Sequence, residues 1–236
     1  MKQRIWELDA LRGLCIVCVV IIHFLYDLTD LYQLVNWEYP AIYLFVRDWG
    51  GVLFLLISGI CVTLGSRCVR RGLLVFASGL AITAVTALMY FLKLADIGII
   101  IWFGVLHCLG ICMLLWPLFQ KLPVWALAAA GAVLAVAGLL LRNCTVSHNW
   151  LVPLGIVSPE FVSADYFPLL PHLGFFLLGA FLGKTLYRKR QSLLPRVDPS
   201  LWPLRFLSLC GKHSLWIYLL HQPVLSVIFW LILSIR

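Results

Sequence analysis

Residues Arg4 to Asp30 read RIWELDALRGLCIVCVVIIHFLYDLTD, an apolar stretch that carries ionisable side chains near both of its ends. Arg12 and His23 are 11 residues apart. In a helix of about 100° per residue they lie within about 20° of one face, separated by roughly 16 Å along the axis. Asp9 and Asp27, at helical-neighbour spacings from them, are expected near the same stripe. Ionisable groups inside a bilayer are costly and usually face a bundle interior or a wet cavity, so this stripe is our first candidate site.

The composition indicates an integral membrane protein. Of the 236 residues, 63% are hydrophobic and 12% are charged, and the mean hydropathy is +1.00. Soluble domains carry about 25% charged residues. At about 20 residues per crossing, seven helices and their loops use the whole length. We therefore expect an all-α, polytopic transmembrane bundle of about seven helices, forming a single domain over residues 1–236.

Seven apolar runs are expected to form these helices. Their bounds are Arg4–Asp30, Trp49–Gly65, Gly72–Leu92, Ile97–Phe119, Leu122–Leu141, His172–Tyr187 and Ser214–Ile235. With these crossings, 14 of the 18 lysines and arginines fall on the side of the N-terminus. The other four are Arg47, Lys93, Arg142 and Arg236. The positive-inside rule therefore predicts an N-terminus inside and a C-terminus outside.

The excess of basic charge has two open explanations. The net charge is +8, and a basic, proline-bearing segment runs from Arg188 to Lys212. Translocation bias and anionic lipid would explain a basic segment on the cytoplasmic side. A phosphate-bearing ligand is the alternative. In either case we expect the lipid bilayer as a partner and no nucleic acid.

The cysteines do not indicate a metal or disulfide framework. Almost all of the eight lie within or beside apolar runs, as small buried residues do. Cys15 with Cys18 and Cys108 with Cys112 have helical-neighbour spacings. A zinc site needs four converging ligands, and nothing in the sequence supplies them. We expect no metal.

His23 is the candidate general base. Imidazole suits proton transfer near neutral pH, and Asp27, four residues on, is placed to orient it. The alternative is a packed helix histidine bonded to a neighbour. On the predicted topology, several polar side chains share the outer face with this pair. They are Arg47, Asp48, Asp165 and His172.

Two further histidines, His107 and His221, lie roughly a third of the way along their predicted spans. Gly104 and Pro223 beside them suggest bends, whose freed backbone groups need polar partners. A structural role is therefore favoured for both histidines, and a place in a polar cavity is the alternative.

Longer motifs resemble known transmembrane acyltransferases. Residues 4–23 follow the pattern R-x3-L-D-x2-R-G-x9-H, whose R-x10-H spacing from Arg12 to His23 resembles the acyltransferase type 3 family. Three other segments resemble the heparan-alpha-glucosaminide N-acetyltransferase catalytic-domain family, and especially its small bacterial members. They are WFGVLHCLGI at 102–111, DYFPLLPHLGFFLLGAFLG at 165–183 and GKHSLWIYLLHQPV at 211–224. The resemblance runs from end to end.

The resemblance implies an acyltransferase. Such an enzyme moves an acyl group, usually acetyl, from cytoplasmic acetyl-CoA through the membrane to a hydroxyl or amine on an extracytoplasmic, sugar-containing acceptor. It also implies a bacterial-type inner (cytoplasmic) membrane. A glycan or glycolipid is the expected acceptor, and a homo-oligomer stays open.

The same resemblance implies roles for the residues singled out above. Arg12, with Asp9 and Arg4, would bind the phosphates of acyl-CoA. His23 would act as general base and Asp27 would orient it. Arg47 or His172 would steady the acceptor or the developing oxyanion. The residues left for the acceptor or its cavity are His107, Asp165, His172 and His221.

One departure and two rival functions accompany this interpretation. The animal lysosomal enzymes carry a reactive histidine in the first luminal loop, whereas residues 29–48 here contain none. The assignment of His23 therefore depends on the type 3 pattern. The rivals are a membrane transporter and a b-type haem protein, in which histidines of separate helices would supply the axial ligands.

Overall fold

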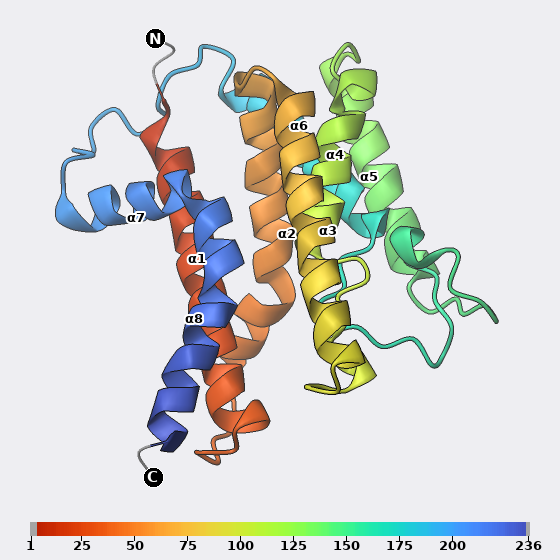
Figure 1. Cartoon of the computed structure of the whole chain (residues 1–236). Helices are drawn as coiled ribbons and strands as arrows, with labels where there is room; N and C mark the ends of the chain where they lie inside the picture. The colour runs from red at the N-terminus through yellow and green to blue at the C-terminus, as the bar shows by residue number, and fades with distance from the viewer. Residues whose placement is uncertain (1–3, 235–236) are drawn as a thin grey trace. The chain divides into compact units, whose positions relative to one another are not determined.

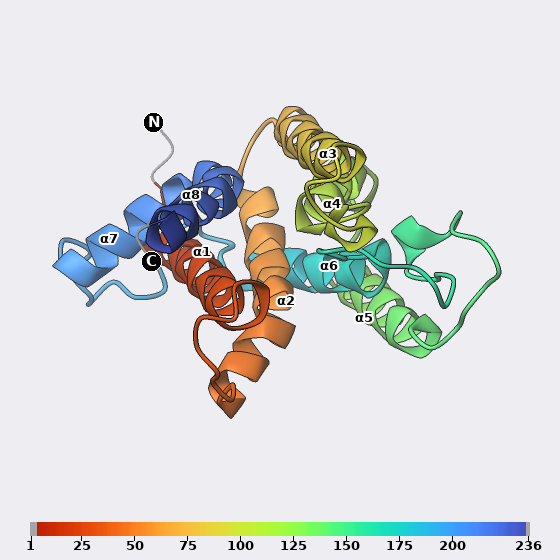
Figure 2. The same ribbon diagram turned by 60° about the horizontal axis from the view of Figure 1, so that its bottom comes forward.

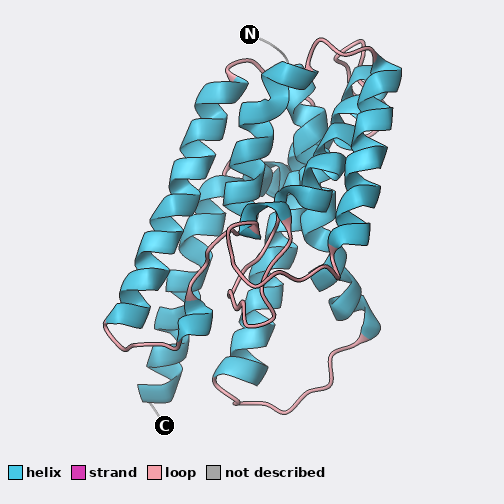
Figure 3. Ribbon diagram, turned by 90° about the vertical axis from the view of Figure 1, so that its right-hand side faces the viewer, coloured by secondary structure: helices cyan, strands magenta, loops and turns pink. Residues whose placement is uncertain are grey.

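The computed structural model describes residues 4–234, which form helices joined by loops (Figures 1 and 3). The α-helices are α1 (Trp6–Tyr26), α2 (Ala41–Leu64), α3 (Cys68–Phe91), α4 (Val105–Phe119), α5 (Val124–Leu141), α6 (Leu169–Leu186), α7 (Trp202–Lys212) and α8 (Ser214–Ser234). Shorter elements are the π-helix η1 (Asp27–Leu31) and the 3-10 helices η2 (Ile97–Ile99) and η3 (Val152–Leu154). Within this range β-structure is limited to isolated bridges. The predicted all-α bundle is confirmed.

Each of the seven predicted runs contains a helix, but the helices are not equally long. Six are long and apolar enough to cross a membrane, α1 being counted together with η1. The fourth run yields α4, with 15 residues, or about 22 Å against a hydrocarbon core of about 30 Å. Residues 97–104 do not extend it: Ile97–Ile99 form η2, and the backbone N–H of Ile101 donates to the hydroxyl of Thr86 at 3.2 Å.

The start of the second helix and the segment before the last helix also differ from the prediction. The second helix begins at Ala41, eight residues before the predicted Trp49, directly after Pro40. The segment from Arg188 to Lys212 contains a helix, α7, that the sequence interpretation left irregular. The predicted end at Ile235 and the charges of Lys2 and Arg236 lie outside the described residues.

The described chain forms two compact units. The first contains the residues up to Phe54 and those from Gln191 onward, and the second runs from Leu55 to Arg190. The boundary falls within α2.

Within the first unit, α1 packs against α7 and α8. Figures 1 and 2 show α8 beside α1, with α7 lying across α1. A Cβ built on Gly13 would lie 1.8 Å from the carbonyl oxygen of Leu207, and one on Gly211 would lie 1.8 Å from that of Asp9. Because no side chain fits at such distances, these two glycines let α7 approach the backbone of α1.

Within the second unit, glycines also bring the helices together. A Cβ on Gly174 would lie 2.4 Å from the backbone nitrogen of Ala135, which pairs α6 with α5. On the same helix, a Cβ on Gly179 would lie 2.1 Å from the Leu56 carbonyl oxygen, and one on Gly183 would lie 2.4 Å from the Thr63 hydroxyl. Glycines on two faces of α6 thus permit close packing, Gly174 against α5 and Gly179 and Gly183 against α2, as small residues do in other membrane proteins.

Candidate functional site

A polar contact in the first unit joins the end of α1 to α8. Asp27 is the first residue of η1 and is only 1% exposed. The side-chain amide of Gln222 donates to both of its carboxylate oxygens, at 3.2 and 3.0 Å. The other end of the amide, Oε1, is buried without a hydrogen-bond partner. Gln222 therefore holds a buried carboxylate and keeps one unused acceptor beside it.

Two histidine rings lie together in the same unit. The ring centroids of His23 on α1 and His221 on α8 are 4.8 Å apart, with the rings tilted by 59°. Nδ1 of His221 lies 2.6 Å from the carbonyl oxygen of Tyr218. A carbonyl only accepts, so Nδ1 carries the hydrogen and Nε2 of the neutral ring keeps a lone pair. That Nε2 is buried and has no hydrogen-bond partner.

The carboxylate of Asp27 is engaged differently from the sequence expectation. Among the described residues, its side chain bonds to Gln222, and no hydrogen bond joins it to the ring of His23. The i,i+4 spacing places Asp27 near His23 but does not decide which neighbour it bonds. Gln222 was not predicted as a site residue from the sequence, although its amide within the apolar run YLLHQPV could have indicated a buried polar partner.

The donor-binding residues predicted from the sequence do cluster. A side-chain nitrogen of Arg12 donates to Asp9 at 2.5 Å, and a nitrogen of Arg4 lies 4.0 Å from the other carboxylate oxygen. Asp9 is buried, and so is Nε of Arg12, which has no partner. Nearby, Glu7 accepts from the backbone N–H of Leu193 at 2.7 Å. Arg12 thus combines an ion pair with one unused buried donor.

Arg47 bonds to a neighbouring aspartate and not to the histidine pair. It forms an ion pair of 2.9 Å with Asp48, and both side chains are about half exposed. Within residues 4–234, no hydrogen bond connects Arg47 to His23 or Asp27. Its predicted role remains a prediction.

His107, in the second unit, has both ring nitrogens occupied. Nδ1 accepts from the backbone N–H of Gly104 at 3.2 Å, so Nε2 carries the hydrogen and faces the hydroxyl of Thr83 at 3.3 Å. That hydroxyl donates in turn to the carbonyl of Ile101 at 2.6 Å. These bonds tie the start of α4 to α3, which favours the structural alternative for His107.

Asp165 and His172 lie near the same end of α4. Oδ2 of Asp165 accepts from the backbone N–H of Val105 at 3.1 Å. Nδ1 of His172 lies 2.6 Å from the carbonyl oxygen of Pro168, which also lies 3.8 Å from the sulfur of Cys108. The structure therefore gathers three predicted residues, His107 included, around the beginnings of α4 and α6.

The loop before α6 is fixed to this cluster. The hydroxyl of Tyr166 donates to the carbonyl of Val152 at 2.7 Å, and the N–H of Phe167 donates to the carbonyl of Phe103 at 2.9 Å. Burial raises the pKa of Tyr166 to about 12, so its hydroxyl stays protonated and remains a donor. The loop between α5 and α6 is thus bonded to itself and to the segment before α4.

The described residues contain neither a cluster of potential metal ligands nor a disulfide bond. Across residues 4–234, no group of three or more histidine, cysteine, aspartate or glutamate side chains could hold a metal ion. All eight cysteines are free thiols, and Cys15, Cys108 and Cys112 are buried.

Comparison with protein families identifies the chain. The family model described as "Heparan-alpha-glucosaminide N-acetyltransferase, catalytic" matches residues 4–223. The chain belongs to this family. The match includes α1 and the histidine and glutamine of α8, so both sides of the His23–His221 contact fall within it. Comparisons with curated proteins and with solved structures find no match.

Membership in the heparan-alpha-glucosaminide N-acetyltransferase catalytic family indicates a transmembrane acetyltransferase. Acetyl-CoA is the donor of this family in general. Together with six apolar helices of spanning length, the family indicates an integral membrane protein. It favours an acetyltransferase over the transporter and haem alternatives.

Proposed function

We propose that the protein transfers an acetyl group from cytoplasmic acetyl-CoA to a hydroxyl or amine of an extracytoplasmic glycan or glycolipid, in a bacterial-type inner membrane. The observation that carries the proposal is the pair of rings of His23 and His221, with the buried, unpartnered Nε2 of His221. Acyl transfer needs a base for the acceptor's proton. His23 is proposed as that base, and the lone pair of His221 lies beside its ring.

The proposed reaction is an attack of the acceptor on the thioester carbonyl. The new C–O or C–N bond forms while His23 takes the acceptor's proton. The C–S bond then breaks, and the proton passes to the departing CoA sulfur. The lone pair of His221 is available to accept a hydrogen bond from the protonated ring or from the acceptor.

Asp27 and Gln222 are proposed as positioning residues. Their two hydrogen bonds join η1, which continues α1, to α8, with Asp27 one turn beyond His23 and Gln222 next to His221. A buried carboxylate also favours a positive charge on an imidazole in its vicinity. Asp27 would thereby orient and stabilise the reaction centre through its place in the bundle, with Gln222 fixing that place.

Arg12 is proposed to bind the phosphates of acetyl-CoA, with Asp9 and Arg4 holding it. Guanidinium groups recognise phosphate well, and the unpartnered Nε of Arg12 offers a donor beyond the ion pair. The distance of roughly 16 Å from Arg12 to His23 along α1 would be spanned by the pantetheine arm. The predicted N-terminus inside and C-terminus outside would put the phosphates in the cytoplasm.

The remaining predicted residues are proposed to serve the acceptor side. Arg47 would steady the acceptor or the oxyanion through its exposed guanidinium. His172, whose Nδ1 hydrogen is used by the carbonyl of Pro168, would do so from Nε2 in its protonated form. Asp165 would contribute to the acceptor side, whereas His107 keeps the structural role that its bonds to Gly104 and Thr83 support. A single domain and a homo-oligomeric state remain predictions.

The proposal is tested with membranes from cells that produce the protein. They would be incubated with acetyl-labelled acetyl-CoA, and the envelope glycan and glycolipid fractions would be separated. Label in one of these fractions, absent from membranes without the protein, supports the proposal. Haem absorbance of the purified protein, or uptake without acetylation, would instead favour a rival function.

A further inference from the structure

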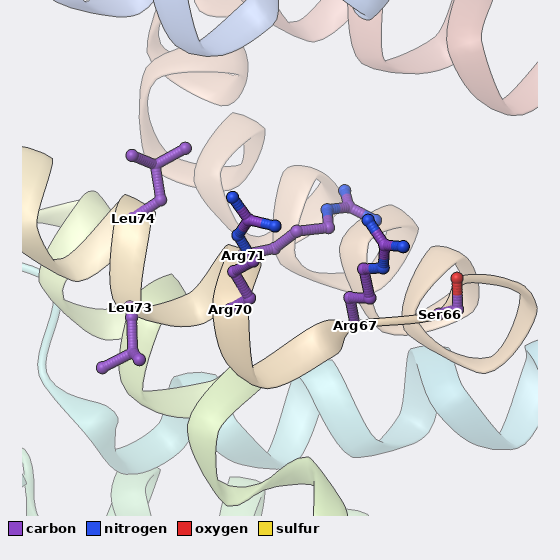
Figure 4. Close-up of a pocket in the computed structure, with 6 residues that line it drawn as sticks. All are labelled: Ser66, Arg67, Arg70, Arg71, Leu73 and Leu74. Atoms are coloured by element: carbon purple, nitrogen blue, oxygen red, sulfur yellow. The ribbon is translucent and has the colours of Figure 1, made fainter.

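An arginine-lined cavity occupies the junction between α2 and α3. It is open, has a volume of about 570 Å³, and is bordered by Ser66, Arg67, Arg70, Arg71, Leu73 and Leu74. Figure 4 shows the three arginine side chains on the same side of the junction. The lining residues fall within 66–74, one short continuous segment of the second unit.

Arg67 and Arg70, two of the arginines of this cavity, have no acidic neighbour in the sequence. No aspartate or glutamate occurs between Trp49 and Ala95. The acids of the second unit are Asp96, Glu160 and Asp165. Asp96 follows the opposite end of α3, whose 24 residues span about 36 Å. In the described part of the chain, the ion pairs involve Arg4, Arg12 and Arg47, and neither Arg67 nor Arg70.

The position of the junction indicates where a balancing anion would come from. Both α2 and α3 are candidate membrane spans, and three residues separate them. The junction therefore lies where the chain leaves and re-enters the bilayer, at the level of the lipid headgroups. Guanidinium groups there form paired, charge-assisted hydrogen bonds with phosphate.

Two leucines form an apolar side of the cavity. Leu73 and Leu74, one turn further into α3, are 55% and 61% exposed. A ligand that contacts the arginines and these leucines together must carry a phosphate next to a hydrocarbon chain. This combination fits an anionic phospholipid better than a wholly water-soluble phosphate ester.

We propose that this cavity binds the headgroup phosphate of an anionic phospholipid, with Arg67 and Arg70 as its principal ligands and Leu73 and Leu74 against the acyl chain. None of the cavity's residues is among those proposed for acetyl transfer, so the lipid proposal can be tested independently of that function.

Purified protein in dodecyl maltoside, titrated with dioleoylphosphatidylglycerol and observed by native mass spectrometry, tests the proposal. The variant R67Q/R70Q should bind this lipid about 30-fold more weakly than the unaltered protein. Each arginine lost near a membrane surface is expected to weaken binding of an anionic lipid by about fivefold. The matched control is R188Q/K189Q, which loses the same charge in another loop and should bind nearly as well as the unaltered protein. Dioleoylphosphatidylcholine should bind weakly to all three.

Several outcomes would overturn the proposal. Equal weakening in both double variants would show that overall charge attracts the lipid. Equal binding of phosphatidylcholine would show that the headgroup charge is not recognised. Displacement of the lipid by acetyl-CoA from the unaltered protein, but not from R67Q/R70Q, would assign the cavity to the acetyl donor. If the glutamine variant does not fold, R67K/R70K keeps the charge, and undiminished binding to it would rule out paired guanidinium contacts.

Discussion

The side-chain amide of Gln222 spans both oxygens of Asp27, at 3.2 and 3.0 Å, and so joins positions 195 residues apart in the sequence. Asp27 lies one turn beyond His23, and Gln222 directly follows His221. The two hydrogen bonds therefore fix α1 and α8 at the level where the histidine rings meet.

Replacing Gln222 by leucine should destabilise the protein. The buried carboxylate of Asp27 would lose its donors, which costs about 1–3 kcal/mol. Thermal unfolding of the detergent-solubilised protein would measure the loss. Adding Asp27→Asn should recover part of it, because the neutral amide is less costly to bury. Equal stability of Gln222→Leu and the unaltered protein would show that the contact contributes nothing.

Replacing Arg12 by lysine should weaken donor binding while the charge opposite Asp9 is kept. Lysine lacks the Nε donor and the planar fork, so KM for acetyl-CoA should rise about tenfold, with kcat changed less. Initial rates at varied acetyl-CoA concentrations would show this, and Arg142→Lys, at an exposed position, is the control. An unchanged KM would count against the phosphate role.

Alanine at Gly13 or Gly211 should disrupt the packing of α7 on α1. An added Cβ meets backbone at 1.8 Å in either place, and overpacking typically costs about 1–3 kcal/mol. Gly50→Ala is the matched control, since its Cβ would meet only the Val46 side chain at 3.8 Å. If all three variants unfolded at the same temperature, the close approach of the two helices would be refuted.

Replacing His107 by phenylalanine should lower stability more than it lowers acetyl transfer per folded molecule. The backbone N–H of Gly104 and the hydroxyl of Thr83 would lose a partner, at a cost of about 1–3 kcal/mol. His148→Phe, in an exposed loop, is the control. Loss of activity without loss of stability would instead assign His107 to the acceptor cavity.

The positions of the spanning helices could be predicted from sequence, because long apolar runs leave few alternatives in a bilayer. The shortening of α4 could not. Residues 97–104 are as apolar as a helix requires, but α4 begins only at Val105, whose N–H donates to Asp165, 60 residues away. Such tertiary bonds have no signature in local composition.

The candidate site shows the same division. Helical spacing places Arg12 and Asp9 together, and the structure joins them. Helical spacing also places Asp27 near His23. It does not identify Gln222 as the partner of Asp27, because Gln222 comes from the other end of the chain. The helix α7 was missed because an 11-residue amphipathic segment within a basic stretch resembles a loop in composition.

The central claim is that His23, paired with His221, does the chemistry of acetyl transfer. The most direct measurement is the rate of acetyl transfer from labelled acetyl-CoA in membranes containing equal amounts of folded unaltered protein, His23→Ala and His148→Ala. Removal of a general base should slow transfer about 100-fold or more, and the His148 variant should match the unaltered protein. Near-normal transfer by His23→Ala would contradict the account.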